Sequence, residues 1–263
     1  CNVCICDYNI DSDFLPIIDK NNLKKGDLVV WINYWGCMSE TTINRVASLQ
    51  KDCGVDVLID NCMAFFCKPL DNIFNVYSCR KFIGVPDGAF IKGRILTNKV
   101  LELYETASNY LFLLEAIEKG SSMVYDEYLK NESRFDKYVI PYAMPELTGR
   151  ILSMVDYEYI KQKRKDNFRV LDNVLGKHNQ LLIDYKTETP YVYPFFNDSE
   201  VLRKNLLDNH IFVSQHWKHI LKSNKSNYFE KLLADKVIPL PIDQRYDEGN
   251  MIRLAKFVLK YCV

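Results

Sequence analysis

An acid, a hydroxyl and an amine come at the ends of successive apolar runs in the first third of the chain. Asp60 directly follows the run Val55–Ile59. Ser78 follows the run Ile73–Tyr77, and Lys81 comes three residues later. An amine with these neighbours suits a Schiff base with an aldehyde cofactor, because the acid can pair with the cofactor's ring nitrogen and the hydroxyl can hold its phosphate.

The apolar runs predict the elements that position these groups. A third run, Ala89–Ile91, follows the turn formed by Pro86, Asp87 and Gly88. Continuous apolar runs bounded by turn residues are typical of strands buried on both faces of a sheet. Because ligands of such sheets bind beyond the carboxyl ends of the strands, we expect the three polar groups to meet at one edge.

The upstream sequence predicts the neighbouring part of this sheet. Cys1–Tyr8 and Leu28–Tyr34 are apolar runs with the length of strands. Ser39 is predicted to cap an amphipathic helix over Glu40–Cys53, which leads back to the run before Asp60. This strand–helix–strand order predicts a parallel, right-handed unit.

Helical periodicity predicts long helices in the middle of the chain, over Lys99–Lys119, Met123–Asn131 and Glu146–His178. The final third alternates between strand and helix patterns, which predicts a small α/β domain. Its predicted strands are Tyr191–Phe196, Ile211–Ser214 and Val237–Pro241, and its predicted helices are Glu200–Asn209, Ser226–Asp235 and Glu248–Tyr261.

The composition excludes several classes of function. The 263 residues, 48% of them apolar, can bury a sizeable core. The 34 basic residues balance the 34 acidic ones, which predicts no binding to nucleic acid or to an anionic membrane. No apolar run has the length of a membrane span. Nine cysteines, an odd number, predict reduced thiols and hence a cytoplasmic protein.

Two groups of residues have the types of side chain that bind metals, but neither has a complete ligand set. Cys1, Cys4 and Cys6 have no second cysteine pair at a suitable spacing, so we predict that they are buried in a strand. The histidines around Trp217 are predicted to serve packing and surface roles; they are His210, His216 and His219. We therefore predict no metal.

Several motifs resemble those of one enzyme family when taken in order along the chain. The stretches LIDNCMAFF and YSCRKFIGVPDGAFI carry Asp60, Ser78 and Lys81. A charged helix with Lys163, Arg164 and Asn167 follows, then YVYPFF and VIPLPIDQRYDEGNMIRLAKFV. This order resembles the sugar aminotransferases of the DegT/DnrJ/EryC1/StrS group, which are fold-type I pyridoxal-phosphate enzymes. The resemblance covers nearly the whole chain.

The resemblance implies an α/β fold with a mostly parallel sheet, helices on both faces and a small C-terminal α/β domain. It places a large cofactor-binding domain over residues 1–155 and the small domain over 156–263. It implies that Lys81 holds pyridoxal phosphate as a Schiff base and moves protons in catalysis. Asp60 would pair with the ring nitrogen, Ser78 would hold the phosphate, and Met63 would pack against the ring.

The same resemblance implies the partners. The acceptor would be a nucleotide-linked keto sugar, and the donor would be an amino acid such as glutamate or glutamine. The active site of this fold lies at a dimer interface, so we expect a homodimer whose shared surface lies beside the Lys81 loop.

The chain also departs from the family pattern. Met63 replaces the usual His or Gln and cannot donate a hydrogen bond to the cofactor. The stretch PYAMPELTGR does not match the family's Asn-Tyr-Arg element, which reaches the partner's cofactor. We expect the chain to begin after the segment that cradles the phosphate, so that the cofactor binds weakly or not at all.

Two alternatives remain open at this stage. One is a catalytically silent paralogue, or an assembly or binding subunit, that keeps the aminotransferase fold. The other is a hydrolase with Cys62 or Cys67 as nucleophile, for which the sequence offers no suitably placed histidine.

Overall fold

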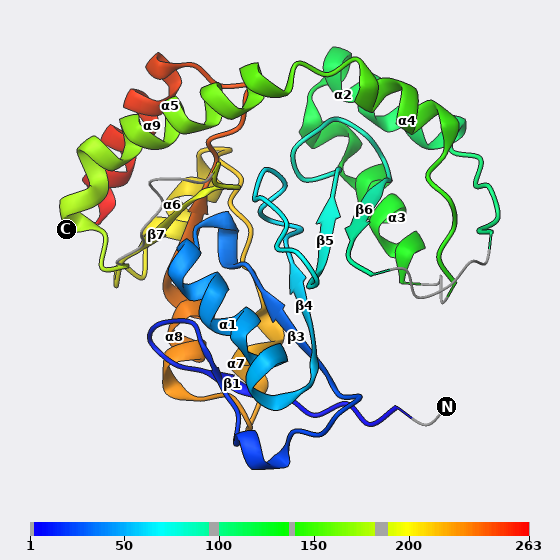
Figure 1. Ribbon diagram of the computed structural model, residues 1–263. Helices are drawn as coiled ribbons and strands as arrows, with labels where there is room; N and C mark the ends of the chain where they lie inside the picture. The colour runs from blue at the N-terminus through cyan, green and yellow to red at the C-terminus, as the bar shows by residue number, and fades with distance from the viewer. Residues whose placement is uncertain (1–2, 95–99, 137–139, 182–188, 263) are drawn as a thin grey trace.

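A four-stranded sheet carries the predicted site residues (Figure 1). The computed structural model describes residues 3–94, 100–136, 140–181 and 189–262. The strand order is β3 (Leu28–Ile32), β4 (Asp56–Asp60), β5 (Phe74–Ser78) and β6 (Ala89–Lys92). β3, β4 and β5 are parallel, and β6 runs antiparallel to β5. The prediction of a largely parallel sheet is confirmed.

The crossover helix α1 (Glu40–Cys53) joins β3 to β4 and has the predicted bounds. The Ser39 hydroxyl accepts a hydrogen bond from the Thr42 N–H at 3.1 Å, which satisfies one of the free donors of the first turn. Ile43, Val46 and Leu49 recur at helical spacing and are buried against the sheet.

The strand β6 differs from the prediction of a strand buried on both faces. All four of its residues are exposed, and Ile91 is 74% exposed. The reason is its position: β6 is an antiparallel strand at the edge of the sheet, so it has a neighbour on one side only among the described strands.

The helical middle of the chain is more divided than predicted. Residues 100–106 are not helical, and the first helix is α2 (Leu111–Lys119), preceded by the 3-10 turn η3 (Ala107–Tyr110). Lys99, the predicted start, lies outside the described residues. The turn η4 (Ser121–Val124) then leads into α3 (Tyr125–Phe135).

The predicted helix Glu146–His178 is wrong as a single element. It consists of α4 (Glu146–Ser153), α5 (Tyr157–Leu175) and the 3-10 turn η5 (Gly176–His178). The break occurs because Asp156 accepts a hydrogen bond from the Tyr159 N–H at 2.9 Å and so caps a new helix.

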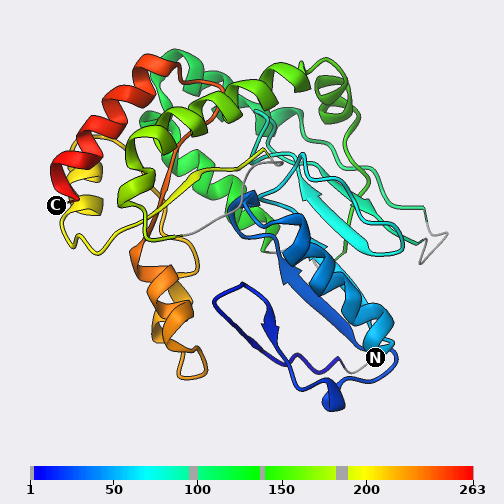
Figure 2. The same ribbon diagram turned by 60° about the vertical axis from the view of Figure 1, so that its left-hand side comes forward.

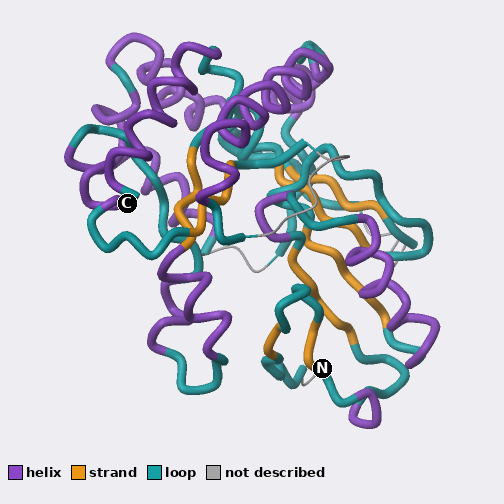
Figure 3. Tube along the Cα trace, turned by 90° about the vertical axis from the view of Figure 1, so that its left-hand side faces the viewer, coloured by secondary structure: helices purple, strands orange, loops and turns teal. Residues whose placement is uncertain are grey.

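The final third contains a two-stranded antiparallel sheet among helices, shown from two further directions in Figures 2 and 3. α9 has the predicted bounds and packs along α5. The predicted strand Ile211–Ser214 is wrong, because its residues form a loop. The elements are β7 (Tyr193–Phe196), α6 (Leu202–Asp208), α7 (Lys218–Lys222), α8 (Tyr228–Lys236), β8 (Val237–Leu240) and α9 (Glu248–Tyr261).

The N-terminal prediction is also wrong. Residues 3–8 form no strand, and Cys4 and Cys6 are exposed, whereas Cys1 lies outside the described residues. Regular structure begins only with two short antiparallel strands, β1 (Asn9–Ile10) and β2 (Pro16–Ile17). An apolar run without pairing partners among the described residues does not become a buried strand. No helix within the described ranges is long and apolar enough to cross a membrane.

Two clusters of buried apolar side chains support the sheet edge. The larger joins residues of β3, β4 and α1 to residues of α5, β7, β8 and α9. The smaller contains the loop after β5, with Cys79, Phe82 and Ile83 packed against Tyr110, Leu152 and Ile160. The loop that carries Lys81 is therefore anchored by apolar residues on both sides of the lysine.

The loop after β3 approaches the loop after β4 closely at Gly36. Gly36 has a φ of +71°, and a Cβ placed there would lie 2.2 Å from the carbonyl oxygen of Met63. Gly54 has a similar φ of +69°, but a Cβ there would meet nothing within 4 Å.

We therefore expect Gly36→Ala to lower the free energy of unfolding by roughly 1–3 kcal/mol more than Gly54→Ala does. Both alanines are strained at positive φ, and only the first also clashes with backbone. Chemical denaturation of both variants measures the difference. Equal losses of unfolding free energy in the two variants would show that the loop after β3 does not contact the loop after β4.

Candidate functional site

Asp60 and Ser78 lie at the carboxyl ends of neighbouring parallel strands, as predicted. Asp60 ends β4 and pairs in register with Val76 of β5, two residues before Ser78. Asp60 is half-buried, and its Oδ1 accepts a hydrogen bond from the Cys62 N–H at 2.8 Å. This bond fixes the orientation of the carboxylate at the edge of the sheet.

Three buried asparagines join the ends of β3 and β4 to the neighbouring strand β5 beside Asp60. Asn33 Nδ2 donates to Asn61 Oδ1 at 3.0 Å, and Asn61 Nδ2 donates to Asn75 Oδ1 at 3.4 Å. All three side chains are no more than 1% exposed. The Asn33 N–H also donates to the Asp60 carbonyl oxygen at 3.0 Å. The network therefore links the residues that follow β3 and β4, Asn33 and Asn61, to Asn75 within β5.

Lys81 lies in the loop after β5, where burial lowers the pKa of its amine. The negative charges of Cys62, when ionised, and of Asp60 oppose this shift, and Arg80 adds to it. Lys81 therefore lies close enough to Asp60 for the two charges to interact. The two residues follow one another at the same edge of the sheet, Asp60 at the end of β4 and Lys81 after β5. A lowered pKa makes the neutral, nucleophilic form of the amine more abundant.

The turn after Lys81 is held by a buried acid. Asp87 is 5% exposed and accepts hydrogen bonds from the hydroxyl groups of Thr106 and of Thr148, the latter at 2.6 Å. Asn131 Nδ2 donates to the Pro86 carbonyl oxygen at 3.0 Å. These contacts tie the Lys81 loop to η3, α3 and α4, so the position of the lysine depends on the helical middle of the chain.

Tyr191 and His216 complete the surroundings of Lys81, and sequence reasoning did not assign either to the site. The Tyr191 ring centroid lies 5.8 Å from Lys81 Nζ, and the ring stacks on the imidazole of His216 with the centroids 6.5 Å apart. Tyr191 N–H donates to the Trp35 carbonyl oxygen at 2.9 Å. We call Tyr191 and His216 the aromatic wall. The backbone hydrogen bond of Tyr191 joins the segment before β7 to the loop after β3.

The protonation of His216 follows from its hydrogen bonds. Trp35 Nε1 can only donate, and it lies 3.2 Å from Nδ1 of His216, so that nitrogen carries no proton. Nε2 therefore carries the proton and donates to Ser214 Oγ at 2.8 Å. Burial, and then the positive charges of Lys81 and Arg203, lower the pKa of His216 to about 4. His216 is a neutral imidazole beside the lysine.

The helix α3 adds a second group that was not predicted. Glu132 forms an ion pair with Arg80, and its negative charge raises the pKa of Lys81. The Arg80 guanidinium lies 4.2 Å from the centroid of the Phe135 ring. Arg80 is thus held by two residues of α3, Glu132 and Phe135.

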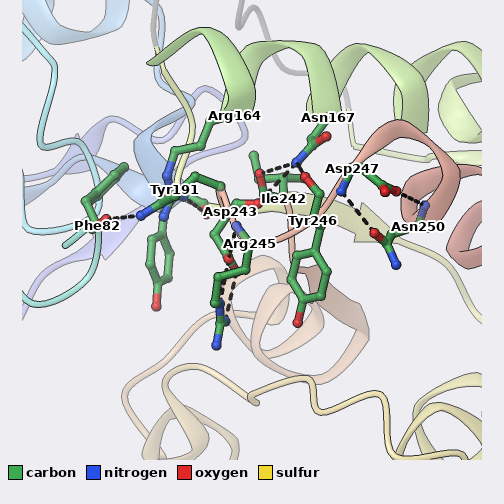
Figure 4. Close-up of polar contacts among 11 residues, drawn as sticks. Phe82, Arg164, Asn167, Tyr191, Ile242, Asp243, Arg245, Tyr246, Asp247 and Asn250 are labelled. Atoms are coloured by element: carbon green, nitrogen blue, oxygen red, sulfur yellow. Dashed lines mark hydrogen bonds and ion pairs between the residues drawn. The ribbon is translucent and has the colours of Figure 1, made fainter. Parts of the chain in front are cut away.

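A buried polar cluster behind Tyr191 supports the wall (Figure 4). Arg164 is 2% exposed, donates to the Tyr191 carbonyl oxygen at 2.9 Å and lies 4.4 Å from the centroid of the Phe82 ring. Burial lowers the pKa of Arg164 to about 10. Asn167 donates to three carbonyl oxygens of the segment between β8 and α9, each at 3.1 Å. These contacts position Tyr191 from the side of α5.

The remaining predicted residues have different surroundings. Ser78 is 9% exposed and its backbone pairs with Ala89 of β6. Met63 is equally buried and packs in the larger apolar cluster. Cys62 is half-buried, and burial, then the Asp60 charge, raise its pKa to about 12. A thiol held in its neutral form is a poor nucleophile, which disfavours the hydrolase alternative.

The donors and acceptors at the sheet edge fit pyridoxal phosphate. One Asp60 oxygen is held by the backbone, and the second can pair with a protonated ring nitrogen. No hydrogen bond or ion pair within the described part of the chain holds the Lys81 amine, although charges surround it. Among the described residues, no group of three or more histidine, cysteine or acidic side chains could hold a metal ion.

The fold that carries this acid and this lysine can be compared with those of known proteins. No protein-family model and no curated protein sequence matches the chain. Solved structures do match, and they show that the chain has the fold of the DegT/DnrJ/EryC1/StrS sugar aminotransferases. The expected fold class is confirmed.

Three of these structures illustrate the match. A DegT/DnrJ/EryC1/StrS aminotransferase from Brucella abortus is 10% identical, with a TM-score of 0.54 over 90% of this chain and 64% of that one. The sugar aminotransferase CalS13 from Micromonospora echinospora is 14% identical, with a TM-score of 0.59 over 93% and 69%. An aminotransferase from Psychrobacter cryohalolentis is 10% identical, with a TM-score of 0.59 over 95% and 73%. The chain thus spans less than two thirds of the Brucella protein's length.

The neutral His216 predicts a pH dependence of stability. Its pKa is about 4 when folded and near 6.5 when unfolded, so the unfolded chain binds more protons between these values. The free energy of unfolding should therefore fall by roughly 2–3 kcal/mol as the pH drops from about 6.5 to about 4.

Denaturation across this pH range checks the prediction. His216→Asn should remove most of the decrease, whereas the control His219→Asn, at an exposed position of α7, should keep it. A decrease that persists in full in His216→Asn would assign the pH dependence to other groups.

Proposed function

We propose that the chain carries out pyridoxal-phosphate-dependent amino transfer to a nucleotide-linked keto sugar. The observation that supports this most is the pair formed by Lys81 and Asp60 at one edge of a parallel sheet, with burial lowering the pKa of the lysine. The neighbouring fold supports the substrate class: one solved structure of the same fold, DesI, is described in the presence of its TDP-sugar product. The amino donor would be an amino acid such as glutamate or glutamine.

Each site residue has a separate role in this proposal. The cofactor, when bound, supplies an electron sink for carbanion charge. Asp60 keeps the ring nitrogen protonated, and Lys81 binds the cofactor and then moves a proton at the substrate carbon. Ser78 holds the phosphate, and Met63 packs near the ring as a neutral, apolar neighbour. Tyr191 and His216 exclude water from the lysine, which keeps its neutral form accessible.

The first test of this proposal is covalent labelling. Pyridoxal phosphate followed by borohydride should fix the cofactor on Lys81, because that amine is half-buried and has a lowered pKa. Peptide mapping by mass spectrometry locates the label. Lys161, which pairs with Glu158 at 2.6 Å on the surface of α5, is the internal control and should stay largely unlabelled.

Lys81→Arg should keep the charge and abolish specific labelling. Label on another lysine with Lys81 unmodified would end the assignment. Absence of label in the wild-type chain, with the fold intact, would favour the silent-subunit alternative.

The same proposal includes a homodimer whose shared surface lies beside the Lys81 loop. Large apolar side chains are exposed on α2, whose Leu113 packs against the smaller apolar cluster; among them are Leu114 at 58% and Ile117 at 82%. Exposed apolar patches of this kind are typical of protein–protein interfaces.

Sedimentation analysis should therefore find a dimer, and Ile117→Glu should weaken it because the variant places a charge on an apolar face. Leu207→Glu on α6, where the apolar side chain is 41% exposed, is the control and should leave the dimer intact. A strictly monomeric wild-type chain over a wide concentration range would contradict this part of the proposal.

A further inference from the structure

The guanidinium of Arg134 is a buried charge without a hydrogen-bond acceptor. Its Nε, Nη1 and Nη2 atoms are all buried and have no partner within the described part of the chain. The rings of Tyr104 and Phe135 lie 5.3 and 5.2 Å from its central carbon. Aromatic faces attract a cation, but they do not satisfy the five N–H donors of the fork. A buried guanidinium in this state needs an acceptor.

A second buried polar atom next to it needs a donor. Asn131 precedes Arg134 by three positions on α3, so the two side chains lie on the same face of the helix. Asn131 Nδ2 donates to the Pro86 carbonyl oxygen at 3.0 Å, which fixes the orientation of the amide. Its Oδ1 is buried and has no partner among the described residues. The site thus offers donors and an acceptor side by side.

Both residues line a cavity of about 240 Å³ between α2 and α3, which are neighbours in Figure 1. Leu111 and Phe112 give it an apolar wall, and Ser108 and Asn109 are polar. Pockets for drug-sized ligands are about 300–1,000 Å³. This cavity is smaller, and it therefore suits a ligand of a few heavy atoms.

The carboxylates at the cavity already have counter-ions. Glu127 pairs with Lys130 at 3.7 Å, and Glu115 pairs with Lys119 at 2.9 Å. Arg134 is therefore the cation at this cavity for which the described residues provide no ion pair.

We propose that this cavity binds a small carboxylic acid that carries a neighbouring amino or hydroxyl group. The ligand's carboxylate accepts hydrogen bonds from the Arg134 guanidinium, and its amino or hydroxyl group donates to Asn131 Oδ1. Its short apolar side chain packs on Leu111 and Phe112. A guanidinium fork matches the geometry of a carboxylate, and inorganic phosphate has no apolar part to pack on Leu111 and Phe112. The proposal does not depend on whether the chain binds pyridoxal phosphate.

Calorimetric titration of the whole chain with four probes tests the proposal. L-Valine and L-2-hydroxyisovalerate carry both groups, isovalerate lacks the donor, and inorganic phosphate lacks the apolar part. We expect saturable binding of valine, of hydroxyisovalerate or of both, and the stronger of the two distinguishes an amino acid from a hydroxy acid. Isovalerate and phosphate should bind several-fold more weakly.

Arg134→Met should weaken the binding of the favoured probe at least about tenfold, because it removes a charge-assisted hydrogen-bond pair. Arg150→Met is the matched control: Arg150 is exposed on α4, pairs with Glu146 at 2.6 Å and should not affect binding. Without ligand, Arg134→Met should unfold at the same or a higher temperature than the wild type, because it removes a buried charge that lacks an acceptor.

Three results would overturn the proposal. One is the absence of saturable binding of both bifunctional probes, and another is undiminished binding by Arg134→Met. The third is a marked fall in the unfolding temperature of ligand-free Arg134→Met, which would show that Arg134 pairs with a carboxylate of its own chain.

Discussion

The side-by-side alignment of β3, β4 and β5 at their carboxyl ends is the constraint on which the site depends. Backbone pairing alone leaves the residues after each strand free to diverge. Here Asn33, Asn61 and Asn75 hydrogen-bond in series below the edge, and the Asn33 N–H also holds the Asp60 carbonyl. Because these amides are buried, breaking one bond leaves a polar group unsatisfied, which costs about 1–3 kcal/mol. The network therefore resists movement of Asp60.

Lys81 is positioned by a different set of contacts, and this has a consequence for the chemistry. Its loop is anchored through Asp87 to η3 and α4, while the wall against it comes from Tyr191 and His216, over a hundred residues later. The amine is therefore enclosed by parts of the chain that meet only when both apolar clusters are formed. Enclosure lowers the pKa of the lysine, and neighbouring acids limit that effect. The reactivity of the Lys81 amine therefore depends on the complete fold, because both apolar clusters must form before the amine is enclosed.

Local sequence signals predicted the parallel strands of the sheet well. Apolar runs located β3, β4 and β5 to within two residues at each end, and a capping serine located the start of α1. The strand ends then placed Asp60 and Ser78 at one edge of the sheet, with Lys81 in the loop that follows. The break before α5 also had a local signal, since Asp156 is a good capping residue, but the helical pattern on both sides of it obscured the break.

The contributions of Tyr191, His216 and Glu132 could not be predicted in the same way. Each reaches Lys81 from a distant element, and no periodicity or spacing connects those elements to the loop after β5. The sequence predicts packing and surface roles for the histidines near Trp217, but it does not reveal the contact of His216 with Trp35. The sequence predicts that β6 is buried, whereas its residues are exposed. An apolar run does not reveal whether its strand has one neighbouring strand or two.

The ionisation of Lys81 is the most direct test of this account, and it needs no cofactor. Competitive labelling with a limiting amine reagent over a range of pH, read out peptide by peptide, gives the pKa of this single amine. The account predicts a pKa for Lys81 clearly below the ordinary value of a lysine, and below that of the half-exposed Lys161 of α5 measured in the same sample. A Lys81 that titrates with Lys161 or above it would show an amine in open solvent or in a tight ion pair. Either result would contradict the enclosed site described here.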